Sequence, residues 1–120
     1  MSHYVDGFVL AIPKAKLAAY KKLATQAGRV WRDHGALEYR ECVADDMEAP
    51  DMVSFPKLTK AGEDEVVIFA WAIFKSRKHR DAANKKIMAD PRLGAMCEVS
   101  KSIVNCKRMA YGGFTTLVAL

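Results

Sequence analysis

The segment 65–75 (EVVIFAWAIFK) constrains the fold more than any other part of the chain. Its apolar run, 66–74, is too short for a membrane-spanning helix, which needs roughly 20 residues, so it is predicted to be a strand of a soluble protein. Side chains alternate along a strand, which divides this one into two apolar sets. One set is Val66, Ile68, Ala70, Ala72 and Phe74, and the other is Val67, Phe69, Trp71 and Ile73. Both faces of the sheet must therefore be covered.

Helical and extended patterns alternate around this strand. Residues 4–12 are mostly apolar and predict a first strand, and Pro13 after it suits the first turn of a helix, where its missing N–H would have no partner. From there to His34 the apolar side chains recur every three or four residues, which predicts a helix, and Gly35 suits the left-handed residue that ends it. Residues 36–44 predict a second strand, and residues 46–62 form a long connection without a sustained period.

The second half of the chain repeats this arrangement. Ser76 is a predicted N-cap for a basic helix over residues 77–89, and Asp90-Pro91 is expected to begin a second short helix that runs through Cys97. Residues 107–120 predict a last strand, in which Gly112-Gly113 is expected to form a bulge or a close backbone approach.

The order of these elements predicts an α+β fold. Strand–helix–strand–strand–helix–strand is the order of a ferredoxin-like βαββαβ domain, with a four-stranded antiparallel sheet and both helices on one face. The other face carries Phe69 and Trp71, which are too apolar to remain in water at that density. A second identical sheet is the simplest cover, so a face-to-face homodimer of one domain, 1–120, is predicted.

Composition indicates the cellular compartment and the classes of partner. The three cysteines are odd in number and lack C-x-x-C spacing, and no signal peptide is read, so a reducing, cytoplasmic location is expected. The formal net charge is +5, but the basic residues of 75–86 read as the solvated face of a helix, so nucleic-acid binding is not favoured. No membrane partner is expected.

Four blocks of sequence carry a family resemblance: YVDGF, AGRVWRDHGALEYRECVADD, FKSRKHRDAANKKIMADPR and KRMAYGGF. Together they resemble the YbaA-like family of small, uncharacterised bacterial proteins over almost the whole chain. That family resembles the dimeric α+β barrel superfamily, which includes cofactor-free quinol-type monooxygenases and haem-degrading monooxygenases. The resemblance implies the fold and the dimer, and it implies no particular activity.

The haem-degrading relatives use an Asn on the first strand, a Trp on the third strand and a His on the second helix. By resemblance, Trp71 and His79 are the candidate catalytic residues here. The first strand offers Asp6 and Gly7 where the Asn would stand, so one of the three groups is missing. A core or interface role for Trp71, and a solvated His79 between Lys78 and Arg80, are the structural alternatives.

Two further groups are candidate ligand-binding residues. The first spans the end of the first helix and the next strand, and comprises Trp31, His34, Tyr39 and Arg40. Arg40 and Glu41 are strand neighbours that point to opposite faces, so they cannot form one acid–base pair, and His34 could instead interact with the helix dipole. The second group is Arg108 and Tyr111 beside the two glycines, for which a strand bulge is the alternative.

Three functions remain open at this point. The first is a small-molecule binder or a cofactor-independent, monooxygenase-like enzyme with an apolar pocket. The second is a non-enzymatic dimeric interaction or regulatory module that uses residues 46–62 as a contact arm. The third is weak RNA binding through the basic helix. The sequence has no phosphate-binding loop, no G-x-S-x-G elbow and no zinc spacing among His3, His34 and His79, so no cofactor or metal is predicted.

Overall fold

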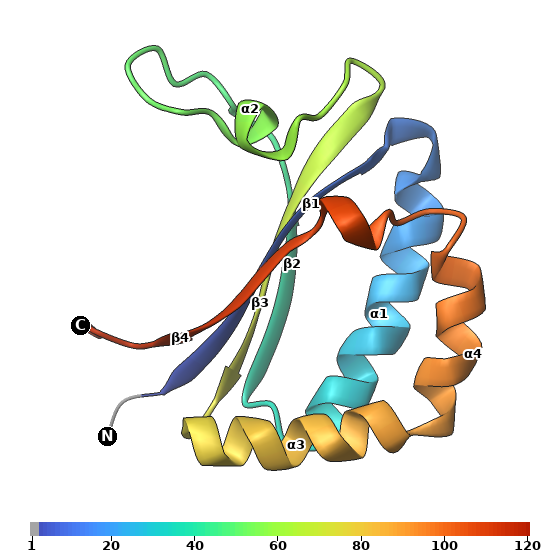
Figure 1. The fold of residues 1–120 in the computed structure, drawn as a ribbon, viewed down its shortest axis with the longest axis vertical. Coiled ribbons are helices and arrows are strands. Elements are labelled where there is room, and N and C mark those ends of the chain that lie inside the picture. Colours follow the sequence, from blue (N-terminus) through green and yellow to red (C-terminus); the bar gives the residue numbers. More distant parts are fainter. Residues whose placement is uncertain (1–2) are drawn as a thin grey trace.

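The structure, a computed structural model that describes residues 3–120, contains a layer of strands and a layer of helices (Figure 1). The strands are β1 (Tyr4–Pro13), β2 (Glu38–Val43), β3 (Glu65–Phe74) and β4 (Ala110–Thr115). The α-helices are α1 (Leu17–Asp33), α2 (Phe55–Thr59), α3 (Arg77–Ala89) and α4 (Pro91–Ser100), and 3-10 turns occupy Lys14–Lys16 and Cys106–Arg108. The predicted order of strands and long helices is confirmed.

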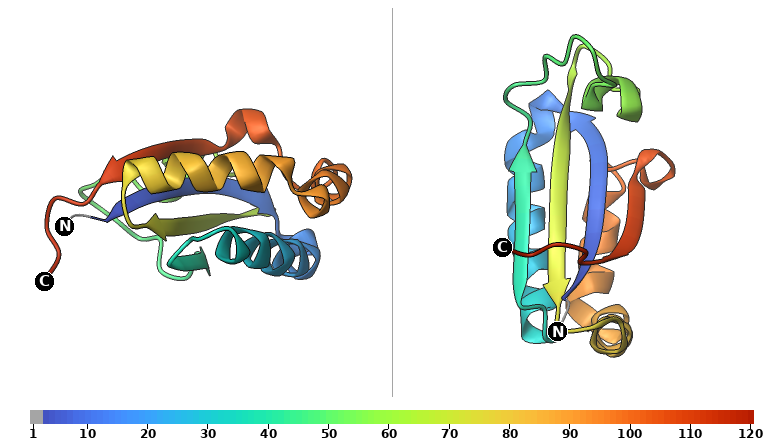
Figure 2. Two further views of the ribbon diagram at one scale, coloured as in Figure 1. Left: turned by 90° about the horizontal axis from the view of Figure 1, so that it is seen from below. Right: turned by 90° about the vertical axis from the view of Figure 1, so that its left-hand side faces the viewer.

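The four strands form one antiparallel sheet in the order β2-β3-β1-β4. The central pair is in register from Tyr4 opposite Phe74 to Pro13 opposite Glu65. The helices α1, α3 and α4 all lie against the same side of this sheet (Figures 1 and 2). This is the predicted ferredoxin-like α+β fold.

The alternation of β3 sorts its apolar side chains as predicted. Ala72 and Phe74 are fully buried with Val30 of α1 and Ile87 of α3 in the main core cluster. Phe69 and Trp71 point to the other side of the strand, away from the core, and Phe69 is 44% exposed. We call this second side of the sheet the open face. It carries Val5, Val9, Val67, Phe69, Trp71, Ile73 and Phe114.

The helix boundaries are set by the residues expected to cap them. The Ser76 side chain accepts a hydrogen bond from the His79 backbone N–H at the start of α3. Asp90 does the same for the Arg92 N–H at the start of α4. Gly35 follows α1 with φ +116°, a backbone conformation that suits glycine.

Three expected details differ. Pro13 ends β1 rather than beginning the helix, because it lies opposite Glu65 in the sheet and α1 starts four residues later, at Leu17. The last strand covers only 110–115 of the expected 107–120. Gly112 and Gly113 pair in regular register with Gly7 and Asp6, so no bulge forms there. A Cβ at Gly113 would lie 2.4 Å from the Tyr4 hydroxyl oxygen, so this glycine makes room for a ring.

An ion pair joins the turn before β4 to the start of β3. The two terminal nitrogens of Arg108 donate to the two carboxylate oxygens of Glu65, each at 2.8 Å, and the Gly62 backbone N–H donates at 2.9 Å. The Arg108 hydrogen bonds, followed by that of Gly62, lower the pKa of Glu65 to about 2. Arg108, a predicted ligand-binding residue, is therefore engaged in a structural contact.

This contact predicts a specific pH dependence. A carboxyl whose pKa is lowered on folding adds stability above its ordinary pKa, and that stability is lost as the pH falls through the folded value. We expect Glu65→Gln to unfold at lower urea concentration than the parent at neutral pH, and the difference to narrow as the pH approaches 2. Glu63→Gln, a change at an exposed neighbour, is the control. A deficit in Glu65→Gln that does not change with pH would contradict the assignment.

Candidate functional site

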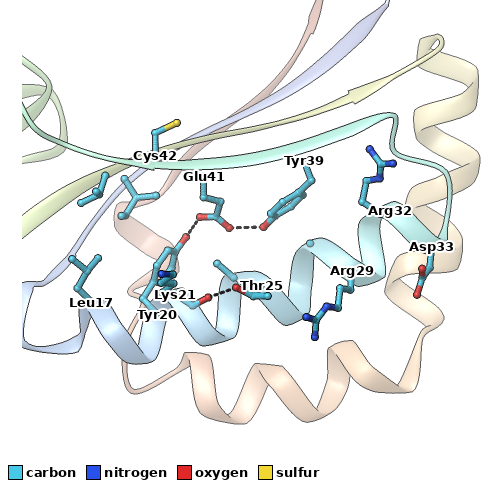
Figure 3. Close-up of a pocket in the computed structure, with 14 residues that line it drawn as sticks. Leu17, Tyr20, Lys21, Thr25, Arg29, Arg32, Asp33, Tyr39, Glu41 and Cys42 are labelled. Carbon is cyan, nitrogen blue, oxygen red and sulfur yellow. Dashed lines mark hydrogen bonds between the residues drawn. The ribbon is translucent and has the colours of Figure 1, made fainter.

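A groove of about 660 Å³ runs between α1 and the edge strand β2 (Figure 3). Its lining is largely apolar, with Leu17, Ala24 and Gly28 from α1 and Val43 and Ile68 from the sheet. A ligand site is usually a concave, mostly apolar space with a few polar groups that converge in it. This groove has that composition.

The polar centre of the groove is Glu41. Tyr20, from α1, donates its hydroxyl to one carboxylate oxygen of Glu41, and Tyr39 donates to the other (Figure 3). Tyr39 and Glu41 point to the same side because they are two residues apart on β2. The groove thus places one acidic group between two phenols.

Burial is the main cause of the raised pKa of both phenols. It raises the pKa of Tyr20 and of Tyr39 far above that of an ordinary tyrosine, and the Glu41 carboxylate raises both further by its charge and its hydrogen bonds. Both hydroxyls therefore stay protonated at neutral pH and act as hydrogen-bond donors to Glu41. The acceptors left for a ligand are the free lone pairs of the three side chains.

A glycine of α1 gives the Tyr39 ring its place. A Cβ at Gly28 would lie 2.8 Å from a ring carbon of Tyr39, closer than side-chain carbons approach one another. The Trp31 ring packs on the same tyrosine, with the ring centroids 5.9 Å apart. Trp31 and Tyr39, both predicted ligand-binding residues, therefore meet, although Trp31 does not line the groove.

The helix side of the groove is basic. Lys21, Arg29 and Arg32 line it, and all three come from α1 (Figure 3). Arg32 donates to the backbone oxygen of Leu37 at the start of β2. Asp33, at one end of the groove, is paired with Arg92 of α4 at 2.8 Å.

The two candidate catalytic residues do not meet. Trp71 lies on the open face, where its indole nitrogen donates to Glu38 at 2.6 Å and its ring faces the Arg40 guanidinium at 5.9 Å. His79 lies on the helix side, next to Phe74. Its imidazole lies against Gly35, where a Cβ would be only 2.9 Å from Nε2. The sheet separates the two side chains, because Trp71 has the opposite orientation to Phe74. The structure thus gives no pocket that contains both.

The remaining predicted ligand-binding residues also lie in different parts of the structure. His34 has its Nε2 2.8 Å from a carboxylate oxygen of Asp90, at the junction of α3 and α4. Arg40 points away from the groove, because the strand alternation that turns Glu41 inward turns Arg40 outward. Of all the predicted site residues, only Tyr39 lines the α1–β2 groove.

Tyr111 belongs to a second polar cluster, at the other edge of the sheet. Its hydroxyl accepts a hydrogen bond from Arg80 at 2.9 Å, and the same Arg80 nitrogen lies 2.6 Å from Asp6. Asp6 is 1% exposed, and the guanidinium also lies over the Tyr4 ring at 4.8 Å. Burial raises the pKa of Asp6, although the charge and hydrogen bond of Arg80 oppose that rise. Asp6, Arg80 and Tyr111 satisfy one another's polar groups, and none of the three lines the α1–β2 groove, so we treat the cluster as structural.

Sequence reasoning left Tyr20 and Glu41 out of the predicted binding residues, although it considered Glu41 as the acid–base partner of Arg40. Tyr20 reads as one more apolar position in the helical stripe, and Glu41 reads as one charge on a partly polar strand. The available signal was the shared face of Tyr39 and Glu41 on the predicted strand. Within residues 3–120, no cluster of three or more His, Cys, Asp or Glu side chains could hold a metal ion, and no helix is long and apolar enough to cross a membrane.

Two solved structures illustrate the fold. A putative antibiotic biosynthesis monooxygenase from Nitrosomonas europaea aligns over 96% of this chain and 90% of its own, with a TM-score of 0.60 and 10% identity. SnoaB, a cofactor-independent oxygenase from Streptomyces nogalater, aligns over 98% and 96%, with a TM-score of 0.56 and 11% identity. At such identities the likeness concerns the fold alone. It defines the chain as an α+β protein with a ferredoxin-like fold.

The sequence identifies the family. The chain belongs to the family described as "Protein of unknown function (DUF1428)", which matches residues 3–103. The "Uncharacterized protein YbaA" of Escherichia coli K12 is 42% identical over 116 residues, which cover 96% of this chain and 97% of that protein. The YbaA protein of Shigella flexneri has the same identity and coverage. The resemblance stated from the sequence blocks is therefore confirmed.

Proposed function

We propose that this protein binds a small organic molecule in the α1–β2 groove, with Glu41 as the group that accepts a hydrogen bond or a proton from it. The observation that carries the proposal is the placement of the Glu41 carboxylate, held by Tyr20 and Tyr39, in a largely apolar groove of about 660 Å³. A carboxylate fixed by two donors keeps a defined orientation, and the lone pairs that remain can receive a ligand hydroxyl or amine.

A catalytic version of this proposal is a cofactor-independent, monooxygenase-like enzyme. The fold likeness to SnoaB supports it, and so does the presence of a proton acceptor in the groove. Transfer of its hydroxyl proton to Glu41 would leave the organic molecule as an anion, which gives electrons more readily to molecular oxygen, the co-substrate of a monooxygenase. In this version Glu41 is the general base, since both neighbouring tyrosines keep their protons.

We further propose that one domain, residues 1–120, forms a homodimer through the open face, in the cytoplasm of a bacterial cell. Phe69 and Phe114 are 44% and 61% exposed on that face. Residues 116–120 leave β4 on the same side and pass in front of the sheet, with Leu117 95% exposed (Figure 2). Such an apolar surface favours an interface with a second copy. The free cysteines support a reducing compartment.

The non-enzymatic module is the second candidate. Its supporting observation is the connection 44–64, which contains α2. Just before α2, the apolar side chains of Met52 and Val53 are 79% and 74% exposed. Phe55 of α2 approaches Phe69 of the open face, with the ring centroids 6.0 Å apart. This arm therefore extends the surface that we assign to the second copy.

Filling the groove tests the ligand proposal. We use N-phenyl-1-naphthylamine, an uncharged fluorophore with one N–H donor, as the probe. Thr25 is exposed and lines the groove, so Thr25→Trp should occupy the space and abolish most of the probe's fluorescence increase. Lys22→Trp adds the same ring to an exposed position of α1 that does not line the groove, and should leave binding unchanged. Equal binding by both variants would place the probe elsewhere and remove the support for this site.

Native mass spectrometry of the protein purified from its own cells addresses the ligand and the dimer together. A dimer with added mass would identify the bound molecule. A dimer without added mass would favour the interaction module.

A further inference from the structure

We infer that the natural ligand of the α1–β2 groove is an organic anion with an apolar body, bound with its acidic group at the α1 side. This inference rests on the proposed function and names the class of molecule that the same groove would take. It follows from the distribution of charge around the groove.

The cationic side of the groove is built by α1. Its residues are Lys21, Arg29 and Arg32. The first and the last are eleven positions apart, which corresponds to about 16 Å along a helix. Within residues 3–120, neither Lys21 nor Arg29 takes part in an ion pair. Two uncommitted cations at the mouth of an apolar groove favour a negatively charged ligand.

The acidic groups of the groove do not cancel this charge. The three lining cations outnumber the two lining acids, Asp33 and Glu41, and Asp33 also pairs at 2.8 Å with Arg92, which it shares with Asp90. Glu41 lies on the opposite wall, on β2, and receives the hydroxyls of Tyr20 and Tyr39. The groove therefore has a hydrogen-bond acceptor on the strand side and positive charge on the helix side, with apolar surface between them (Figure 3).

A matching ligand has complementary groups at two ends. A carboxylate or sulfonate would face Lys21 and Arg29, and a hydroxyl or amine would face Glu41. The body between them must be apolar, because Leu17, Ala24 and Ile68 line the space between the two polar sides. An aromatic acid with a hydroxyl or amino group has this pattern.

A matched pair of probes isolates the charge. Anilinonaphthalene-8-sulfonate is N-phenyl-1-naphthylamine with one added sulfonate, so the two share the apolar body and differ in charge. We expect Lys21→Gln/Arg29→Gln to weaken binding of the sulfonate about tenfold, roughly threefold for each exposed cation, and to leave the neutral probe within about twofold. Added salt should weaken binding of the sulfonate alone.

The control removes a charge from the same helix outside the groove. Lys22→Gln should bind both probes as the parent does. If Thr25→Trp blocks both probes but Lys21→Gln/Arg29→Gln binds the sulfonate with unchanged affinity, the ligand is not an anion and the inference fails while the site remains. If Thr25→Trp blocks neither probe, the proposed site itself is wrong.

Discussion

Replacing Arg80 by leucine is expected to lower the free energy of unfolding by about 3–5 kcal/mol at neutral pH, because it leaves a buried carboxylate without its partner. Arg80 is the counter-ion of Asp6, at 2.6 Å, and the two side chains are 11% and 2% exposed. The leucine would also lose the contacts with Tyr111 and with the Tyr4 ring. Urea unfolding followed by circular dichroism measures the change.

The size of this effect should depend on pH. Burial already raises the pKa of Asp6, and removal of the opposing arginine raises it further. An aspartate whose pKa is higher in the folded state destabilises the fold increasingly as the pH rises between its unfolded and folded values. The deficit of Arg80→Leu should therefore be largest at neutral pH and should shrink in acid, where Asp6 is protonated.

The control for Arg80→Leu removes both charges. Asp6→Asn/Arg80→Leu should recover part of the lost stability at neutral pH, because an amide is less costly to bury than an unpaired carboxylate. The recovered part should vanish in acid. A double variant that is no more stable than Arg80→Leu at neutral pH would show that the loss comes from packing and not from charge.

Replacing Phe69 by aspartate is expected to convert the proposed dimer to a monomer at micromolar concentration. Phe69 stands between Phe55 and Trp71 on the open face, with ring centroids 6.0 and 5.5 Å away. In a face-to-face dimer an aspartate here would be a charge in a dry interface without a partner. Size-exclusion chromatography with light scattering measures the change in mass.

The effect of Phe69→Asp on the isolated subunit should be small, because Phe69 is 44% exposed there. The matched control is Met88→Asp, which places the same charge on an apolar residue of α3 that is 64% exposed on the helix side. It should remain a dimer. A soluble dimer of Phe69→Asp would show that the interface lies elsewhere, and a parent protein that is already a monomer would exclude the dimer itself.

The fold could be predicted because local patterns and sheet pairing agree in most of the chain. The alternation of β3 placed Phe74 in the core and Phe69 on the open face, as the structure shows. Pro13 is the exception, since either the end of a strand or the first turn of a helix suits proline. The pairing of Pro13 with Glu65 decides between the two, and that contact spans 52 residues of sequence.

The candidate site was harder to predict because its parts meet only through packing. Tyr20 and Glu41 become neighbours when α1 lies along β2, and nothing in either segment alone indicates this contact. The expectation for Trp71 and His79 came from resemblance to other proteins of the superfamily. It conflicts with the strand alternation, which places Trp71 with Phe69 on the open face.

The shape of the sheet also limits how far association of this protein could proceed. One face is covered by the protein's own helices, so pairing through the other would leave neither subunit with an apolar sheet face for a third copy (Figure 2). The edge strand β2 is short and carries charges at Glu38 and Arg40, features that oppose strand-by-strand growth into fibrils. Isologous pairing of this kind closes on itself. The apolar surface that drives assembly would then be used up in a particle of fixed size, and would not act as a template for aggregation.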